Sequence, residues 1–237
     1  MINPQETVLQ QAPFTRSDGV REARARLVSF FGPDGSGKTT QAKMLAEHLG
    51  ARGVKVRLAW IRSKHTLAYL VLSAMRRLSP GSVVVSPGGG VMRIRGVGGR
   101  SWAILEFLSL APLVLLRVYL PLISGRVVIA ERFLVDSIVA IAYTLGDASF
   151  DTSREAKLML AMIPRNSVLI HLDSDYEEIM RRRGAYSDPP DFVRFQRVMY
   201  ERLSRRLRAA KIDTTTEPVE ETFREILRVA GVAQQAG

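Results

Sequence analysis

The chain has 237 residues, a length that suits one α/β domain or at most two small ones, with room for a sizeable buried core. It contains no cysteine, which excludes a disulfide framework, a thiolate metal site and a cysteine nucleophile. The net charge is +11, and only six of the 34 basic residues are lysine. Because guanidinium groups bind phosphate in a planar, bidentate way, nucleotides are natural partners, although many of these arginines can simply be solvated.

The ends of the chain set the expected domain limits. Residues 1–25 are polar and lack the apolar segment of a secretory signal, so we expect a flexible leader. A single domain is expected over residues 26–233. The absence of cysteine favours a reducing compartment, so the expected location is the cytoplasm.

A glycine-rich loop follows the first apolar run, RLVSFF at 26–31. Its spacing Gly32-x4-Gly37-Lys38-Thr39 fits a P-loop, in which backbone N–H groups and the start of the next helix bind phosphate oxygens. Lys38 would reach the β- and γ-phosphates of a nucleotide, and the Thr39 hydroxyl would ligate Mg²⁺. The alternative is a glycine-rich turn without a ligand.

Strands and helices alternate along the rest of the chain. The apolar patterns predict strands at 26–31, 54–61, 126–130, 167–172 and 211–214. Helices are predicted at 38–49, 65–78, 133–145, 153–163, 191–210 and 218–230, with one more that starts at a capping box, Ser174-x-x-Glu177. Right-handed crossovers between such strands give a three-layer α/β sandwich, with a central parallel sheet of about five strands and helices on both faces.

Two segments do not fit a simple alternation. Residues 79–100 are rich in glycine and valine and too long for a connector, so we expect a short hairpin or a mobile loop. Residues 102–123 are apolar over a length close to a membrane span. Glu106, Arg117 and two prolines in this segment favour a buried or dimer-forming helix, and membrane contact is the alternative.

Charged residues gather where the third predicted strand ends. Glu131 and Arg132 follow VVIA, so both are expected at the carboxyl edge of the sheet, where open α/β folds bind ligands. Glu131 can order Mg²⁺ or hold an acceptor hydroxyl, and Arg132 can neutralise a phosphate. Asp34, inside the glycine-rich loop, is a second carboxylate near the γ-phosphate. The alternatives are a structural Glu131–Arg132 pair and a loop-bracing Asp34.

Residues 181–191, RRRGAYSDPPD, resemble a mobile lid. Arg181, Arg182 and Arg183 end a helix and precede a glycine and two prolines. A lid of this kind can bring guanidinium groups onto a transferring phosphate and exclude water. The alternative is that the arginines only complement the helix dipole. His171, within a predicted strand, is expected to be a core histidine.

With these residues assembled, the chain resembles the thymidylate kinase family of P-loop nucleoside monophosphate kinases over about residues 26–232. FFGPDGSGKTTQAKMLAEHL is similar to the family's phosphate loop and first helix, VVIAERFLVDS to its Asp-Arg-Tyr-x-x-Ser segment, and LIHLDSDYEEIMRRRG to its lid helix. The resemblance implies ATP and Mg²⁺ as cofactors and a nucleotide acceptor. It also implies phosphate binding by Gly35, Ser36, Gly37, Lys38, Thr39 and Thr40.

On the acceptor side, the resemblance implies that Arg132 contacts the acceptor phosphate and that Arg62 and Asp136 belong to the same pocket. The chain departs from the family here. The family's Tyr-Gln pair near the pyrimidine falls at Ala140 and Ile141, and an arginine of its third helix is replaced by Leu110. Loss of such hydrogen-bonding groups changes substrate selectivity strongly.

The main hypothesis is therefore an ATP- and Mg²⁺-dependent kinase that acts on a nucleoside monophosphate, with dTMP as first candidate. We expect a homodimer and no nucleic-acid partner. One rival is a kinase for a nucleoside or another small-molecule hydroxyl. The other is an ATP-binding regulatory or membrane-associated protein with weak turnover.

Overall fold

The computed structural model describes residues 27–61, 67–78, 83–85, 92–94, 98–184 and 189–231. The expected leader at 1–25, much of the segment 79–100 and residues 185–188 of the lid lie outside these described residues. Arg62 also lies outside them.

A parallel sheet of five strands forms the centre of the molecule. The strands are β1 (Leu27–Phe31), β2 (Val56–Trp60), β5 (Val127–Arg132), β6 (Ser167–Asp173) and β7 (Ala210–Asp213). Their order across the sheet is β2-β5-β1-β6-β7, and every neighbouring pair is parallel. β1 lies in the middle and is buried along its whole length, which agrees with its unbroken run of apolar residues. The predicted parallel α/β sheet is confirmed.

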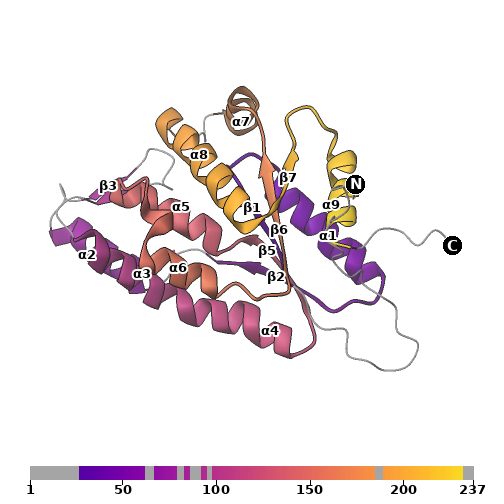
Figure 1. The fold of residues 1–237 in the computed structure, drawn as a ribbon, viewed down its shortest axis with the longest axis horizontal. Helices are drawn as coiled ribbons and strands as arrows, with labels where there is room; N and C mark the ends of the chain where they lie inside the picture. The colour runs from indigo at the N-terminus through magenta and orange to yellow at the C-terminus, as the bar shows by residue number, and fades with distance from the viewer. Residues whose placement is uncertain are drawn as a thin grey trace, which may run out of the picture.

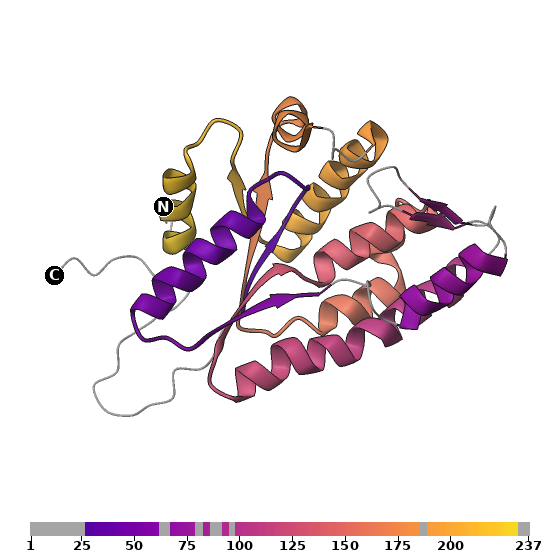
Figure 2. The ribbon, with the colours of Figure 1, turned by 180° about the vertical axis from the view of Figure 1, so that it is seen from behind.

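Helices cover both faces of this sheet, as Figures 1 and 2 show. Helices α1 (Lys38–Ala51) and α9 (Val219–Val229) lie on one face, where α1 buries Ala42, Leu45 and Leu49 against the sheet. The other face carries α5 (Leu134–Leu145) and α8 (Pro190–Leu207), with further helices outside them. The two faces thus form separate cores, and the layered sandwich expected from the sequence is present.

The outer helices extend the second face. They are α2 (Leu67–Leu78), α3 (Gly99–Val114), a π-helical turn η1 (Leu115–Tyr119), α4 (Leu120–Ile123) and α6 (Arg154–Ala161). Strands β3 (Val83–Val85) and β4 (Met92–Ile94) pair antiparallel, as the hairpin alternative for the segment 79–100 predicted. A short 3₁₀ turn, η2 (Phe150–Thr152), precedes α6.

The long apolar helix is buried on one side only. In the most apolar 18-residue window of Gly99–Ile123, the mean hydropathy is 1.9 and about a third of the residues are buried. The helix is long and apolar enough to cross a membrane by composition alone, but Trp102, Leu110 and Val118 pack into the core. Its opposite side exposes Ile104, Leu108, Leu115, Leu116, Leu120 and Ile123.

One local prediction is wrong. Helix α7 (Tyr176–Arg183) begins with Asp175 as its N-cap, and no side chain caps it, so Ser174 and Glu177 do not form a capping box. The Ser174 hydroxyl is buried without a hydrogen-bond partner among the described residues. The helix begins one residue later than expected, and the backbone N–H of Asp175 donates to the Thr215 hydroxyl at 2.9 Å, which ties this turn to the segment after β7.

The prediction for His171 is confirmed. The side chain is fully buried in β6, and its ring stacks on Phe31 with the ring centres 5.2 Å apart. Burial lowers the pKa of His171 to about 4, so the imidazole is neutral at pH 7.

Candidate active site

The glycine-rich loop joins β1 to α1 at the carboxyl edge of the sheet. Gly32 has a φ of +142°, and a Cβ at this position would lie 2.0 Å from the carbonyl oxygen of Leu172. Only glycine therefore lets the loop pass so close to β6. Gly37, with a φ of +87°, is the N-cap of α1 and supplies no side-chain cap. The first turn of α1 thus offers free N–H groups and its positive end to an anion.

Lys38 lies beneath the loop. Only 5% of it is exposed, and its Nζ donates to the carbonyl oxygens of Gly32 at 2.8 Å and Pro33 at 2.7 Å. Burial, and to a lesser extent nearby Arg132, lower the pKa of Lys38 to about 8, although Asp34 and Asp136 oppose the change. A bound phosphate would add negative charge beside this buried ammonium.

Asp34 is the centre of a cluster of positive groups. Its carboxylate lies 3.8 Å from Lys38 Nζ and 3.2 Å from Arg183 Nη1, and it accepts a hydrogen bond from Arg132. Burial favours the neutral form of Arg132, but Asp34 and Asp136 outweigh burial and raise its pKa. Three cations from α1, β5 and α7 therefore converge on one point. A phosphate oxygen could take the place of the Asp34 carboxylate among them.

The three arginines of α7 differ in what they contact. Arg183 reaches Asp34, and Arg182 donates to the Thr214 carbonyl oxygen at 2.5 Å and to the Gly35 carbonyl oxygen at 3.2 Å. Arg181 instead pairs with Glu178 of its own helix, and 74% of its side chain is exposed. α7 therefore brings two of its arginines to the loop, while the third faces solvent.

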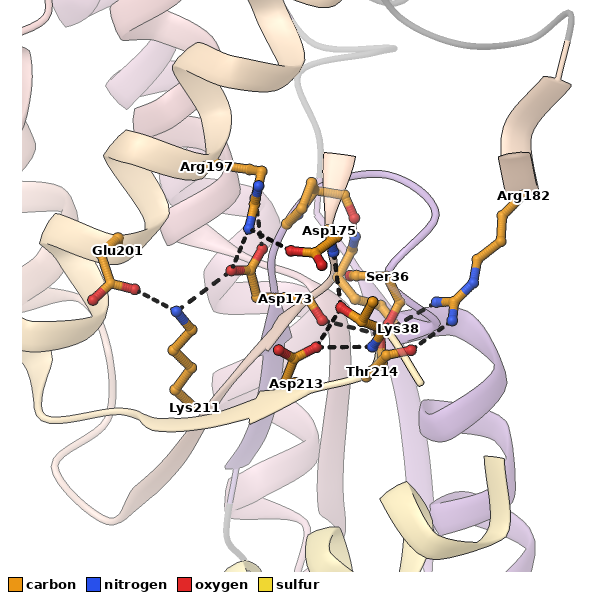
Figure 3. A network of polar contacts seen from close by, with 12 residues as sticks. Ser36, Lys38, Asp173, Asp175, Arg182, Arg197, Glu201, Lys211, Asp213 and Thr214 are labelled. Atoms are coloured by element: carbon orange, nitrogen blue, oxygen red, sulfur yellow. Dashed lines mark hydrogen bonds and ion pairs between the residues drawn. The ribbon is translucent and has the colours of Figure 1, made fainter. Parts of the chain in front are cut away.

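The end of β7 contributes a residue that the sequence analysis did not single out. The Thr214 hydroxyl lies 3.0 Å from the Asp173 carbonyl oxygen and 3.3 Å from that of Ser36, and it accepts from Arg182. Figure 3 shows Arg182 approaching Thr214 from the side of α7. Thr214 is the last residue of the last predicted strand, so the rule that ligands bind beyond carboxyl strand ends could have identified it.

A network of ion pairs joins α8 to β6 and β7 next to this edge of the sheet. Asp173, at the end of β6, accepts from Arg197 of α8 at 3.2 Å and lies 3.4 Å from Lys211 of β7. Lys211 also donates to Glu201 at 2.8 Å (Figure 3). The network links α8 to the two strands that hold Thr214. No sequence pattern indicated this network, because its partners are far apart along the chain.

The glycine-rich loop, Arg132, the arginines of α7 and Thr214 surround a cleft of about 480 Å³. It is lined by Asp34, Gly35, Ser36, Gly37, Lys38, Thr39, Thr40, Gln41, Arg132, Glu178, Arg181, Arg182, Arg183, Thr214, Glu217, Val219 and Thr222. The uncapped start of α1 and the surrounding cations fit the phosphates of a nucleotide. Thr39 lies exposed in the cleft and could ligate Mg²⁺. Among the described residues, no cluster of three acidic or histidine side chains could hold a metal ion.

The remaining predicted residues lie apart from the loop. Glu131 is half-buried at the end of β5, where the pairing with β2 is irregular, and it does not line this cleft. Asp136 is buried under Arg132, 3.8 Å from its Nη1, and is 7% exposed. The structure thus brings Asp34, Lys38, Arg132, Arg182 and Arg183 together and leaves Glu131 outside the cluster.

The similarity of this chain to known proteins lies in its fold. No family model matches the sequence, and no curated protein matches it either. Among solved structures, the chain is similar to thymidylate kinase from Ehrlichia chaffeensis, with a TM-score of 0.51 and 19% sequence identity. The match covers 86% of this chain and 97% of that chain. The chain therefore has a P-loop NTPase-like α/β fold similar to that of a thymidylate kinase.

Proposed function

We propose that this protein is an ATP- and Mg²⁺-dependent phosphotransferase that acts on a nucleoside monophosphate. The convergence of Lys38, Arg132 and Arg183 on Asp34, in front of the uncapped start of α1, supports this proposal most directly. A reaction that transfers a phosphoryl group needs positive charge fixed around the developing negative charge. The fold similarity to a thymidylate kinase makes dTMP the first acceptor to test.

The proposed roles follow from the positions of the residues. Bound ATP would supply the γ-phosphoryl group, and Mg²⁺ on Thr39 would neutralise charge on its phosphates. Lys38 would exchange its loop carbonyl partners for phosphate oxygens. Arg132 would hold the acceptor phosphate, Arg183 would move from Asp34 onto the transferring group, and Asp34, once released, would orient the acceptor.

An acceptor panel tests the proposal. Purified protein is incubated with Mg·ATP and with dTMP, other nucleoside monophosphates, nucleosides and small alcohols, and ADP formation is measured. We expect a monophosphate to raise ADP formation far above basal hydrolysis. The Lys38→Ala variant should lower this rate at least 100-fold, the scale seen when one charge-stabilising group is removed. Near-normal turnover by the variant would contradict the role of Lys38.

A second candidate is a kinase that acts on a neutral hydroxyl, such as that of a nucleoside. It is favoured by two apolar residues that stand where the thymidylate kinase family carries polar groups on the acceptor side. Ile141, in the place of the family's glutamine, is 2% exposed, and Leu110, in the place of an arginine, is fully buried. In the same panel, a nucleoside or small alcohol would then exceed every monophosphate. If no acceptor exceeds basal hydrolysis, the third alternative, an ATP-binding regulatory or membrane-associated protein, gains support.

We further propose that the chain forms a homodimer in the cytoplasm. The apolar side of Gly99–Ile123 is uncovered, and exposed leucines lie on the adjacent helices α2 and α6, at Leu70, Leu78 and Leu158. Exposed apolar surface on this scale is typical of a protein–protein contact. A second copy of the same face would bury it, which is the common arrangement in twofold dimers.

A further inference from the structure

Two carboxylates hold the guanidinium of Arg132 from different directions. Nη2 donates to Asp34, which belongs to the loop and faces the cleft. Nη1 lies 3.8 Å from the carboxylate of Asp136, which lies deeper and is 7% exposed. Asp34 must change partners when a phosphate arrives, if Arg132 and Arg183 are to bind that phosphate. Asp136 can remain in place, so it is the permanent anchor of Arg132.

Asp136 is itself held by two donors. Its Oδ2 accepts from the backbone N–H of Phe133 at 3.1 Å, and its Oδ1 accepts from the Tyr200 hydroxyl at 3.0 Å. Tyr200 belongs to α8 and is 1% exposed, and its ring lies 6.0 Å from the rings of both Phe31 and His171. A buried side chain of this kind has little freedom to move, so its hydroxyl is a fixed donor.

We propose that Tyr200 is a positioning residue, which orients Asp136 and through it the guanidinium of Arg132. The inference rests on the proposed function, in which Arg132 binds the acceptor phosphate. Because Tyr200 is buried beneath Asp136, it does not touch a substrate itself. α8 follows the lid segment in the chain, so it would connect the lid to the acceptor arginine.

The Tyr200 hydroxyl affects the charge state of Asp136, and this charge attracts Arg132. Burial raises the pKa of Asp136, while Arg132, Lys38, the Phe133 N–H and the Tyr200 hydroxyl lower it. Asp34 of the loop is a further charge near this cluster and raises the pKa of Tyr200, and His171, whose ring lies 6.0 Å from that of Tyr200, is a further titratable group. Removing the Tyr200 hydroxyl takes away one donor to the ionised form. Asp136 would then become protonated at a higher pH and stop attracting Arg132.

The first experiment compares two variants that each lose one tyrosine hydroxyl. Tyr200→Phe removes the donor to Asp136, and Tyr119→Phe removes a hydroxyl that donates to the Met162 carbonyl oxygen at 3.1 Å, away from the cleft. We expect Tyr200→Phe to lower kcat/KM for the acceptor at least 10-fold and to leave the Kd for ATP within twofold. The acid limb of its pH profile should move to higher pH.

The control should keep kcat/KM within about twofold of the wild-type value. Unchanged kcat/KM and an unchanged pH profile in Tyr200→Phe would overturn the proposal. Equal losses in both variants would also overturn it, because a general loss of packing would then explain the effect.

The second experiment does not depend on catalysis. Chemical unfolding is measured for Tyr200→Phe, Arg132→Lys and the double variant, without substrate. If Tyr200 acts on Arg132 through Asp136, the two changes in unfolding free energy are not additive. Additive changes would overturn the link even in an active enzyme. Conversely, a wild-type protein that phosphorylates no acceptor would overturn the proposed function, while the non-additivity would still report the contact.

Discussion

Lys38 is the residue whose ionisation should report ligand binding most directly. Its pKa is about 8, because burial and nearby Arg132 lower the pKa more than Asp34 and Asp136 raise it. Its Nζ donates to two neutral carbonyl oxygens. Phosphates would raise this pKa towards that of a free lysine, 10.5. A group whose pKa rises on binding takes up a proton at any pH between the two values.

We therefore predict that Mg·ATP binding takes up a proton near pH 9 and little at pH 7, where Lys38 is already protonated. Calorimetry in buffers of different ionisation enthalpy measures this uptake. The Lys38→Met variant, which keeps much of the side-chain length without the charge, should show less uptake at pH 9. Equal uptake in both proteins would assign the proton to another group.

His171 should control stability in acid. Its pKa is about 4 in the folded chain and 6.5 when exposed, so the unfolded state binds more protons between these values. Above pH 6.5, the neutral buried imidazole therefore contributes roughly 3 kcal/mol to the free energy of unfolding, and this contribution is lost as the pH falls from 6.5 towards 4. In His171→Phe, the free energy of unfolding should depend less steeply on pH in this window. The same slope in both proteins would contradict the prediction.

At the scale of elements, the approach of the P-loop to β6 depends on Gly32. The Gly32→Ala change would place a methyl group 2.0 Å from the Leu172 carbonyl oxygen, in a conformation that alanine rarely adopts. We expect it to destabilise the fold by about 2 kcal/mol or more and to weaken ATP binding. Thermal unfolding and nucleotide titration measure the two effects.

The matched control is Gly50→Ala in α1, where a Cβ would meet nothing within 4 Å. Since glycine disfavours helix, this variant should be neutral or more stable by up to about 1 kcal/mol. Should Gly32→Ala behave like Gly50→Ala, the close contact between the loop and β6 would not limit the loop conformation.

At the scale of the whole molecule, most of the large apolar side chains exposed among the described residues lie on α2, α3, η1, α4 and α6. Leu108, which is 57% exposed there, is a direct test of the proposed dimer. Wild-type protein should sediment at twice the 26.4 kDa chain mass, and Leu108→Glu should sediment as a monomer, because a charge cannot be buried in an apolar interface without cost.

Val198→Glu on α8 is the control, since Val198 is 60% exposed but lies on another helix. It should leave the dimer intact. A wild-type monomer at micromolar concentration would contradict the homodimer and would direct attention to membrane contact, which flotation with liposomes can test.

The sequence by itself was enough to predict the P-loop, the five strands and most helices, because these depend on spacing along a short stretch of chain. Glycine positions set the loop conformation, and apolar periodicity sets which side of each element is buried. The capping box predicted at Ser174 is absent, and the N-cap residue of α7, Asp175, instead donates to Thr215 from another part of the chain, a contact without a local signal in the sequence.

Only the tertiary structure decided which charged residues meet. Arg132 and Asp34 are 98 residues apart in the chain, and Tyr200 and Asp136 are 64 apart. Their contacts exist because β5 and β6 flank β1 and because α8 packs beside α5, and strand order has no local signature in sequence. For the same reason, the sequence could suggest three lid arginines, but only the orientation of α7 separated Arg182 and Arg183 from Arg181.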